Sequence, residues 1–139
     1  MRRARPIRAS VAVGIAGIAL VVPVLASAGG DEMRTVAVTI RYSSFAPQEI
    51  HVTAGETVRF IVRNGDPIDH EFLIGDEDAQ TMHEEGTEAH HGAKPGEVSV
   101  PAGGIVTTTY RFGEPGSTLF GCHLPGHYAY GMRGTIRIG

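Results

Sequence analysis

A thiol, an imidazole and a thioether follow one another at five-residue spacing near the end of the chain. They are Cys122, His127 and Met132, and Pro125 with Gly126 gives a tight turn between the first two. A loop of this kind at the end of a strand can point all three side chains at one centre. Thiolate and thioether sulfurs are soft ligands that favour copper, and imidazole binds both cuprous and cupric ions. The segment is therefore predicted to supply most of a copper site.

A second imidazole would complete the donor set. Two His, one Cys and a weak axial Met are typical of copper sites for electron transfer. His70 is the best candidate, because it follows the turn at residues 64–67 and begins an apolar strand. Zinc seldom takes Met, and an iron–sulfur cluster needs more than the one cysteine present. Three other interpretations stay open: Cys122 as an inert buried thiol, His70 as a surface histidine and Met132 as core filler.

Short runs of β-branched and aromatic residues surround these side chains and are separated by Gly, Pro, Asn and Asp. They predict seven or eight strands, at about residues 36–40, 50–52, 57–62, 71–74, 98–100, 105–112, 118–120 and 134–138. No amphipathic helical period of useful length interrupts them. The pattern favours an all-β fold, an antiparallel Greek-key sandwich or barrel. Such a fold brings distant strands together at one end, so His70 can reach the later loop.

Residues 75–97 break this pattern with a long polar insertion. It is rich in Asp and Glu, has Lys94 as its one cation, and contains four further metal donors: Met82, His83, His90 and His91. Structureless loops of this length are uncommon in compact domains and are usually functional or disordered. A short helix around residues 77–85 is compatible with the sequence. The insertion is either a solvated acidic surface or a weaker, secondary metal site.

The first residues have the three-part plan of a secretory signal peptide. A start rich in Arg precedes an apolar run at residues 11–25, and Ala26-Ser27-Ala28 is an A-x-A cleavage pattern. The apolar run is shorter than the roughly 20 residues that span a membrane. We predict a signal peptide over residues 1–28 and a single exported domain over residues 29–139, in the periplasm or outside the cell. An uncleaved leader that attaches the protein to the membrane is the alternative.

The charge balance excludes one class of partner. The chain has 12 Lys and Arg against 15 Asp and Glu, and four of its arginines lie in the predicted leader, so the mature domain is strongly acidic. Nucleic-acid phosphates require clustered cations, so no nucleic-acid partner is expected. An acidic surface suits a redox partner with a basic docking patch. No nucleophile–base pair or substrate pocket is evident in the sequence, so we do not expect an enzyme. We also expect a monomer.

The strand order, the His after an Asn-Gly turn and the Cys…His…Met loop together resemble the cupredoxins, the fold family of plastocyanin and azurin. The resemblance covers about residues 34–139. His-Glu-Phe at 70–72 and Gly-Cys-His-Leu-Pro-Gly-His-Tyr at 121–128 look most like small exported cupredoxins associated with copper tolerance. The resemblance implies one-electron transfer linked to copper homeostasis. It also implies one type-1 (blue) copper with three in-plane ligands and one axial ligand: His70, Cys122 and His127, and Met132.

Two positions depart from the family pattern. Plastocyanin-like and azurin-like proteins usually have Asn after the first His, where it helps to fix the ligand loop, whereas this chain has Glu71. Multicopper oxidases have His on both sides of the Cys, whereas Gly121 precedes Cys122, so no trinuclear centre is expected. His123 should point to the opposite side of the strand, as a surface residue or as part of an electron path. The alternative function is a copper-sequestering or tolerance protein in which copper is cargo.

Overall fold

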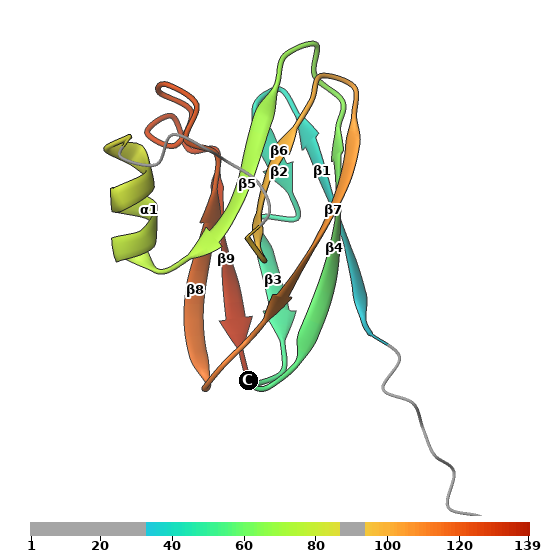
Figure 1. Cartoon of the computed structure of the whole chain (residues 1–139), viewed down its shortest axis with the longest axis vertical. Coiled ribbons are helices and arrows are strands. Elements are labelled where there is room, and N and C mark those ends of the chain that lie inside the picture. The colour runs from blue at the N-terminus through green and yellow to red at the C-terminus, as the bar shows by residue number, and fades with distance from the viewer. Residues whose placement is uncertain (1–32, 87–93) are drawn as a thin grey trace, which may run out of the picture. The chain divides into compact units, whose positions relative to one another are not determined.

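Nine strands and one helix form the part of the chain that this computed structural model describes, residues 33–86 and 94–139 (Figure 1). They are β1 (Thr35–Arg41), β2 (Ser44–Ala46), β3 (Glu49–Val52), β4 (Thr57–Asn64), β5 (His70–Gly75), α1 (Glu77–Glu84), β6 (Glu97–Val100), β7 (Ile105–Arg111), β8 (Gly116–Gly121) and β9 (Arg133–Ile138). The predicted all-β class is confirmed. The predicted leader at residues 1–28 lies outside the described residues. Within them, no helix has the length and apolar character to cross a membrane.

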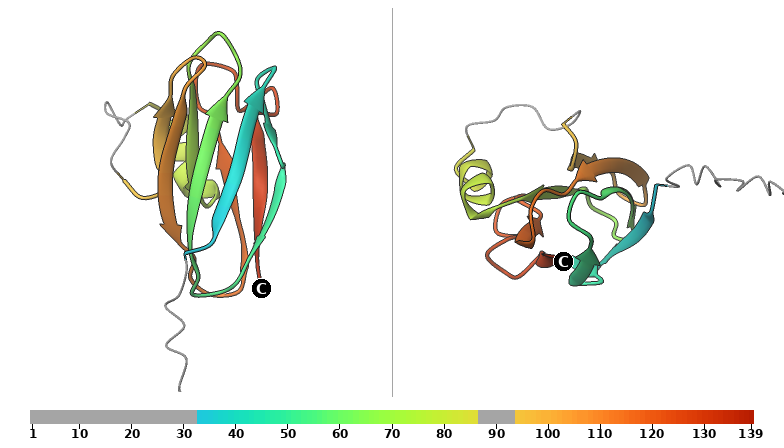
Figure 2. Two further views of the ribbon diagram at one scale, coloured as in Figure 1. Left: turned by 90° about the vertical axis from the view of Figure 1, so that its right-hand side faces the viewer. Right: turned by 90° about the horizontal axis from the view of Figure 1, so that it is seen from below.

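The strands form two sheets that face each other across the core (Figure 2). The first has the order β2-β1-β4-β7 and the second the order β3-β9-β8-β5-β6. Five of the seven strand pairs are antiparallel, but β1 pairs with β4 and β3 pairs with β9 in parallel. The chain passes to the second sheet for β3 before it returns to the first for β4, and β4 then runs in the direction of β1. Both sheets are therefore mixed rather than wholly antiparallel.

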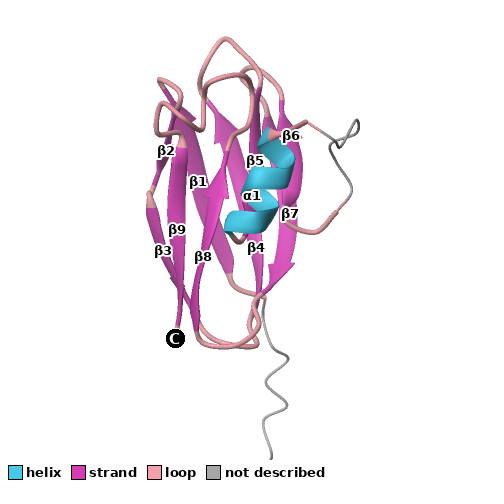
Figure 3. Ribbon diagram, turned by 90° about the vertical axis from the view of Figure 1, so that its left-hand side faces the viewer, coloured by secondary structure: helices cyan, strands magenta, loops and turns pink. Residues whose placement is uncertain are grey.

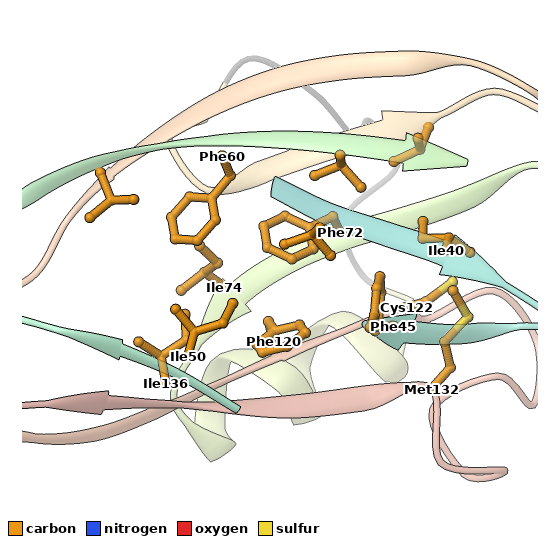
Figure 4. Close-up of a cluster of buried hydrophobic side chains, with 14 of the residues drawn as sticks. Ile40, Phe45, Ile50, Phe60, Phe72, Ile74, Phe120, Cys122, Met132 and Ile136 are labelled. Atoms are coloured by element: carbon orange, nitrogen blue, oxygen red, sulfur yellow. The ribbon is translucent and has the colours of Figure 1, made fainter. Parts of the chain in front are cut away.

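Alternation along the strands places apolar side chains in the core. In β4, Val58, Phe60 and Val62 are buried while Arg59 and Arg63 are exposed, as a period of two requires. Four phenylalanine rings meet at the centre, with ring centroids 5.3 to 5.8 Å apart: Phe45, Phe60, Phe72 and Phe120 (Figure 4). Cys122 and Met132 belong to the same buried cluster. The predicted copper loop is therefore continuous with the core.

Helix α1 begins the insertion and packs on the face of β5 and β8 that points away from the core (Figure 3). Its first turn is capped by Asp76, whose carboxylate accepts a hydrogen bond of 2.9 Å from the N–H of Ala79. Glu77 and Asp78 in the first turn favour the positive end of the helix dipole. The short helix expected around residues 77–85 is therefore present, and it lies close to the copper loop.

Candidate metal centre

The structure brings together the three side chains predicted to bind copper in plane. Nδ1 of His127 lies 3.5 Å from Sγ of Cys122, and Nδ1 of His70 lies 3.9 Å from the same sulfur. One ligand atom from each of the three side chains lies within 4.8 Å of the others. Cys122 and His70 are buried and His127 is half-buried. The three donors therefore face one another around a single point.

Strand pairing explains how residues fifty positions apart meet. β5 begins at His70 and runs antiparallel to β8, with Leu73 opposite Gly121. Cys122, the next residue after β8, consequently lies beside the first residues of β5. The backbone N–H of Glu71 donates a hydrogen bond of 3.3 Å to Sγ of Cys122. Because β5 and β8 are neighbours in one sheet, His70 and Cys122 lie at the same end of the sandwich.

The loop after β8 returns His127 to Cys122. The N–H of Met132 donates to the carbonyl of His127 over 3.0 Å, and the N–H of Cys122 donates to the carbonyl of Met132 over 3.1 Å. Gly126 and Gly131 have φ values of 84° and 98°, in the left-handed region that favours glycine. The tight turns predicted from the sequence are thus the features that close this loop.

Met132 is 1% exposed and lies next to Cys122 (Figure 4). The backbone hydrogen bond between the two residues, at 3.1 Å, agrees with that placement. The side chain belongs to the core cluster as well. Burial is therefore expected of Met132 both as an axial ligand and as core filler, and its role as axial ligand stays a prediction.

Met132→Leu separates these interpretations. A weak, long axial bond contributes little to copper affinity but changes the relative stability of the two oxidation states. Leu is close to Met in volume, so the core should lose less than about 1.5 kcal/mol. We expect the variant to keep its visible absorption and to show a higher reduction potential, measured by redox titration of the copper-loaded protein. An unchanged potential would make Met132 core filler.

Asp66 is a functional residue that the sequence reasoning missed. Its Oδ2 accepts a hydrogen bond of 3.0 Å from Nε2 of His70, and the side chain of His70 is fully buried. The same carboxylate accepts from the N–H groups of Tyr42 (2.7 Å) and Ser43 (2.8 Å), which have positive φ in the turn between β1 and β2. A carboxylate that accepts from one ring nitrogen leaves the other free to bind metal. Nδ1 of His70, which faces Cys122, is that free nitrogen.

The environment of Asp66 keeps it ionised for this role. Burial opposes ionisation, but hydrogen bonds from the N–H groups of Ser43 and Tyr42 and the contact with His70 outweigh burial and lower the pKa of Asp66. Asn64 fixes the turn that carries this residue, because its Oδ1 accepts from the N–H of Asp66 over 2.9 Å. The only sequence signal for this anchor was its place in the turn four residues before His70.

The pKa of the Cys122 thiol is shifted in the opposite direction to that of Asp66. Burial raises its pKa, although the N–H groups of Leu124 and Glu71 act in the other direction. The metal-free site consequently favours the neutral thiol, whereas a metal ligand must be the thiolate. Copper binding should therefore release a proton and weaken as the pH falls.

Glu71 performs two tasks at the position where related proteins usually have Asn. Its N–H donates to Sγ of Cys122, and its Oε2 accepts from the N–H of His123 over 3.3 Å. Nε2 of His83 lies 3.6 Å from the same carboxylate oxygen. The departure from the family pattern thus preserves an acceptor that fixes the strand end carrying Cys122.

His123 differs from the expectation of a surface residue. It points to the opposite side of the strand from Cys122, as predicted, but its side chain is only 1% exposed, because Glu84 and Gln80 of α1 contact its ring. A period of two gives the direction of a side chain but contains no information on what packs over it. Tyr128 packs against the ring of His123, whereas Tyr130, two residues later, is 93% exposed.

The structure describes two of the four proposed secondary donors, and these two differ in exposure. Met82 is 59% exposed on α1, and His83, the next residue, is buried. His90 and His91 lie outside the described residues. Within residues 33–86 and 94–139, the one group of three or more His, Cys, Asp or Glu side chains arranged to bind a metal is that of the predicted copper site. A secondary site stays a prediction.

The donor set fits copper. One thiolate and two imidazoles, with a thioether beside them, match the chemistry of type-1 copper and suit neither magnesium nor calcium. The site is buried within the core cluster, which excludes water, and Asp66 orients one imidazole. When bound, copper supplies a one-electron couple between its cuprous and cupric states.

Comparisons with known proteins agree with this geometry. A copper-resistant cuproprotein, CopI, of Rubrivivax gelatinosus is 39% identical over 98 residues, which are 68% of this chain and 59% of that protein. CopI of Pseudomonas aeruginosa is 27% identical over 76% of each chain. The chain thus spans about three fifths of the length of the first of these relatives.

The fold has solved counterparts as well. Reduced auracyanin from the photosynthetic bacterium Roseiflexus castenholzii superimposes with a TM-score of 0.65 at 23% identity, over 76% of this chain and 96% of that one. The model of the family of copper binding proteins that includes plastocyanin and azurin matches residues 33–139. The chain therefore belongs to the plastocyanin/azurin family, and its cofactor is one type-1 copper.

Proposed function

We propose that this protein is an exported one-electron carrier that acts in copper homeostasis. The observation that carries the proposal is the pre-arranged donor set. Nδ1 of His70 and Nδ1 of His127 already face Sγ of Cys122, and Asp66 fixes the first imidazole. A site whose ligands are fixed by the fold needs little rearrangement between two oxidation states. Fast electron exchange requires this property.

The burial of the three ligands supports exchange at one edge of the site. His70 and Cys122 are buried, whereas His127 is half-buried and offers the shortest way to the surface among the three. Exposed carboxylates lie along α1 and at its C-cap: Glu77, Asp78 and Glu85. This arrangement suits a redox partner with a basic docking patch, and association should slow as salt rises.

Stopped-flow mixing tests the proposal. The reduced, copper-loaded protein would be mixed with a basic c-type cytochrome at several ionic strengths. We expect second-order electron transfer that slows with salt, and a copper site that passes through repeated reduction and oxidation without loss of metal. Release of copper on reduction, or no exchange with any cytochrome tested, would contradict a carrier.

The proposed export and the absence of enzymatic activity rest on the sequence. The basic, apolar and A-x-A segments of residues 1–28 support secretion to the periplasm or the cell exterior. Two buried ligands and one half-buried ligand surround one centre, an arrangement that suits a carrier, and we propose a carrier rather than an enzyme. We also propose that the protein acts as a monomer.

Copper sequestration is the second candidate, because the curated relatives are named copper-resistant cuproproteins. In this case the insertion would bind additional copper as cargo. The test is a copper titration of the parent protein against a variant in which all four donors are changed to Ala: Met82, His83, His90 and His91. Storage predicts more than one copper in the parent and fewer in the variant, with weaker binding as the pH falls through about 6.5, where histidine gains its proton. Equal stoichiometry and pH dependence would leave the insertion without a metal role.

A further inference from the structure

Helix α1 contacts both ring nitrogens of one buried histidine. Nδ1 of His123 lies 2.6 Å from Oε2 of Glu84, and its Nε2 lies 2.6 Å from Oε1 of Gln80. Glu84 and Gln80 are one helical turn apart, so both reach the same ring from the same face of α1. Because His123 directly follows Cys122, these two contacts act on the residue next to the thiolate ligand.

The hydrogen-bond partners of Gln80 determine which of its atoms faces the ring. Its Nε2 donates to the carbonyls of Leu73 (3.4 Å) and Gly75 (3.2 Å) in β5, so its amide oxygen is the atom directed at His123. An amide oxygen only accepts, and Nε2 of His123 must therefore be the donor. The other ring nitrogen, Nδ1, contacts the carboxylate of Glu84, so both ring nitrogens have a partner on α1.

Tyr128 covers the face of the same imidazole. The two rings are stacked, with centroids 4.5 Å apart and planes at 21°. Close packing continues at Gly121, where a Cβ atom would lie 2.5 Å from the Tyr128 ring and 3.1 Å from Oε1 of Gln80. The Tyr128 ring and Gln80 therefore leave no room for a Cβ atom at position 121, and this steric requirement for glycine is independent of copper.

The stacked pair connects the two halves of the copper loop. His123 is the residue after Cys122, and Tyr128 is the residue after His127. Fixing the two rings against each other therefore fixes the spacing of two copper ligands. The His123 network, defined as Gln80, Glu84, His123 and Tyr128, is anchored in β5 through Gln80 and in α1 through Glu84.

We infer that α1 braces the copper loop, and that Gln80 and Glu84 are positioning residues that act on Cys122 through His123. This role gives the insertion a purpose that requires no second metal. Both ring nitrogens of His123 contact side chains of α1, so the network holds the loop through protein contacts alone. The inference rests on the copper site and is independent of the proposed electron transfer.

The test compares two double variants of the same helix. Gln80→Ala with Glu84→Ala removes both contacts to His123, and Thr81→Ala with Glu85→Ala is the matched control on exposed positions with the same spacing. Ala favours helix, so α1 should persist in both. Loss of partners that orient metal ligands typically costs 10–100-fold in metal affinity. We expect a loss of about that size, with an altered cupric paramagnetic resonance spectrum, in the first variant and less than about twofold change in the control.

A second readout uses the metal-free protein. Cys122 is the one cysteine of the chain, so its rate of alkylation by iodoacetamide reports directly on the mobility of the copper loop. Without the two contacts, alkylation should accelerate at least tenfold, while circular dichroism and the cooperative unfolding transition persist. Should the double variant not fold, the single variant Glu84→Ala, at a side chain that is 41% exposed, must still accelerate alkylation.

Three results would overturn the inference. They are copper affinity and alkylation rate within about twofold of the parent in a folded Gln80→Ala, Glu84→Ala protein, an equal change in the matched control, and no acceleration in the single variant Glu84→Ala. None of these readouts involves a redox partner. A protein that fails to exchange electrons can therefore still confirm the brace, and the two proposals fail separately.

Discussion

Cys122→Ser should abolish the intense visible absorption of the copper-loaded protein. That absorption arises from charge transfer between a thiolate and cupric ion, and the chain contains no other cysteine. Ser has nearly the same shape, so the buried position should tolerate it without collapse of the fold. The hydroxyl is a hard, protonated donor and is a poor substitute for a soft thiolate. The expected loss is therefore complete rather than partial.

The measurement is a visible spectrum and a paramagnetic resonance spectrum of parent and variant, each loaded with one equivalent of cupric ion. Circular dichroism provides the control that the variant is folded. Cupric ion bound to the remaining imidazoles would not produce the strong band. A residual band of the parent's position and intensity would show that Cys122 is not the ligand.

Removal of either imidazole should have the second largest effect, and the two histidines should differ. His127→Ala opens a half-buried position, so water or added imidazole can enter and restore part of the spectrum. His70→Ala leaves a buried carboxylate, Asp66, without one of its partners and should also cost about 1–3 kcal/mol of folding stability. Both should weaken copper binding by more than the 10–100-fold typical of an outer partner.

Copper affinity by competition with a chelator, and denaturant unfolding of the metal-free proteins, distinguish these outcomes. Imidazole is added to both variants as the rescue experiment. His51→Ala is the control, since this histidine is on the surface, where its ring contacts the carboxylate of Glu49. If either ligand variant retains the parent's affinity and spectrum, that histidine does not bind the metal.

The sequence alone indicated most side chains of the candidate site because their chemistry is local, while the role of Met132 as axial ligand stays a prediction. The types and spacing of Cys122, His127 and Met132 indicate copper without knowledge of the fold. His70 needed one further step, since only strand pairing shows that β5 begins beside the end of β8. Alternation of apolar residues predicted most strands, but β2, with three residues, was too short to be recognised. The same alternation does not encode the direction of a neighbouring strand, which is why the parallel pairs were not expected.

The parts that sequence reasoning missed all depend on tertiary contacts. Asp66 is an ordinary turn residue in the sequence, and only the fold shows that it joins the β1–β2 turn to His70. His123 was expected at the surface, because nothing in a strand pattern indicates that the insertion folds back over it. The helix itself was predictable from its cap and charges, whereas its docking face was not.

The spectrum of the metal-loaded protein tests the central claim most directly. Cupric ion is added stepwise to the purified, metal-free protein while visible absorption and paramagnetic resonance are recorded, and the sample is then reduced and reoxidised. A type-1 centre predicts an intense visible band that saturates at one copper per chain, disappears on uptake of one electron and returns on reoxidation. A colourless complex at full occupancy would contradict the assignment of His70, Cys122 and His127 as a type-1 copper site.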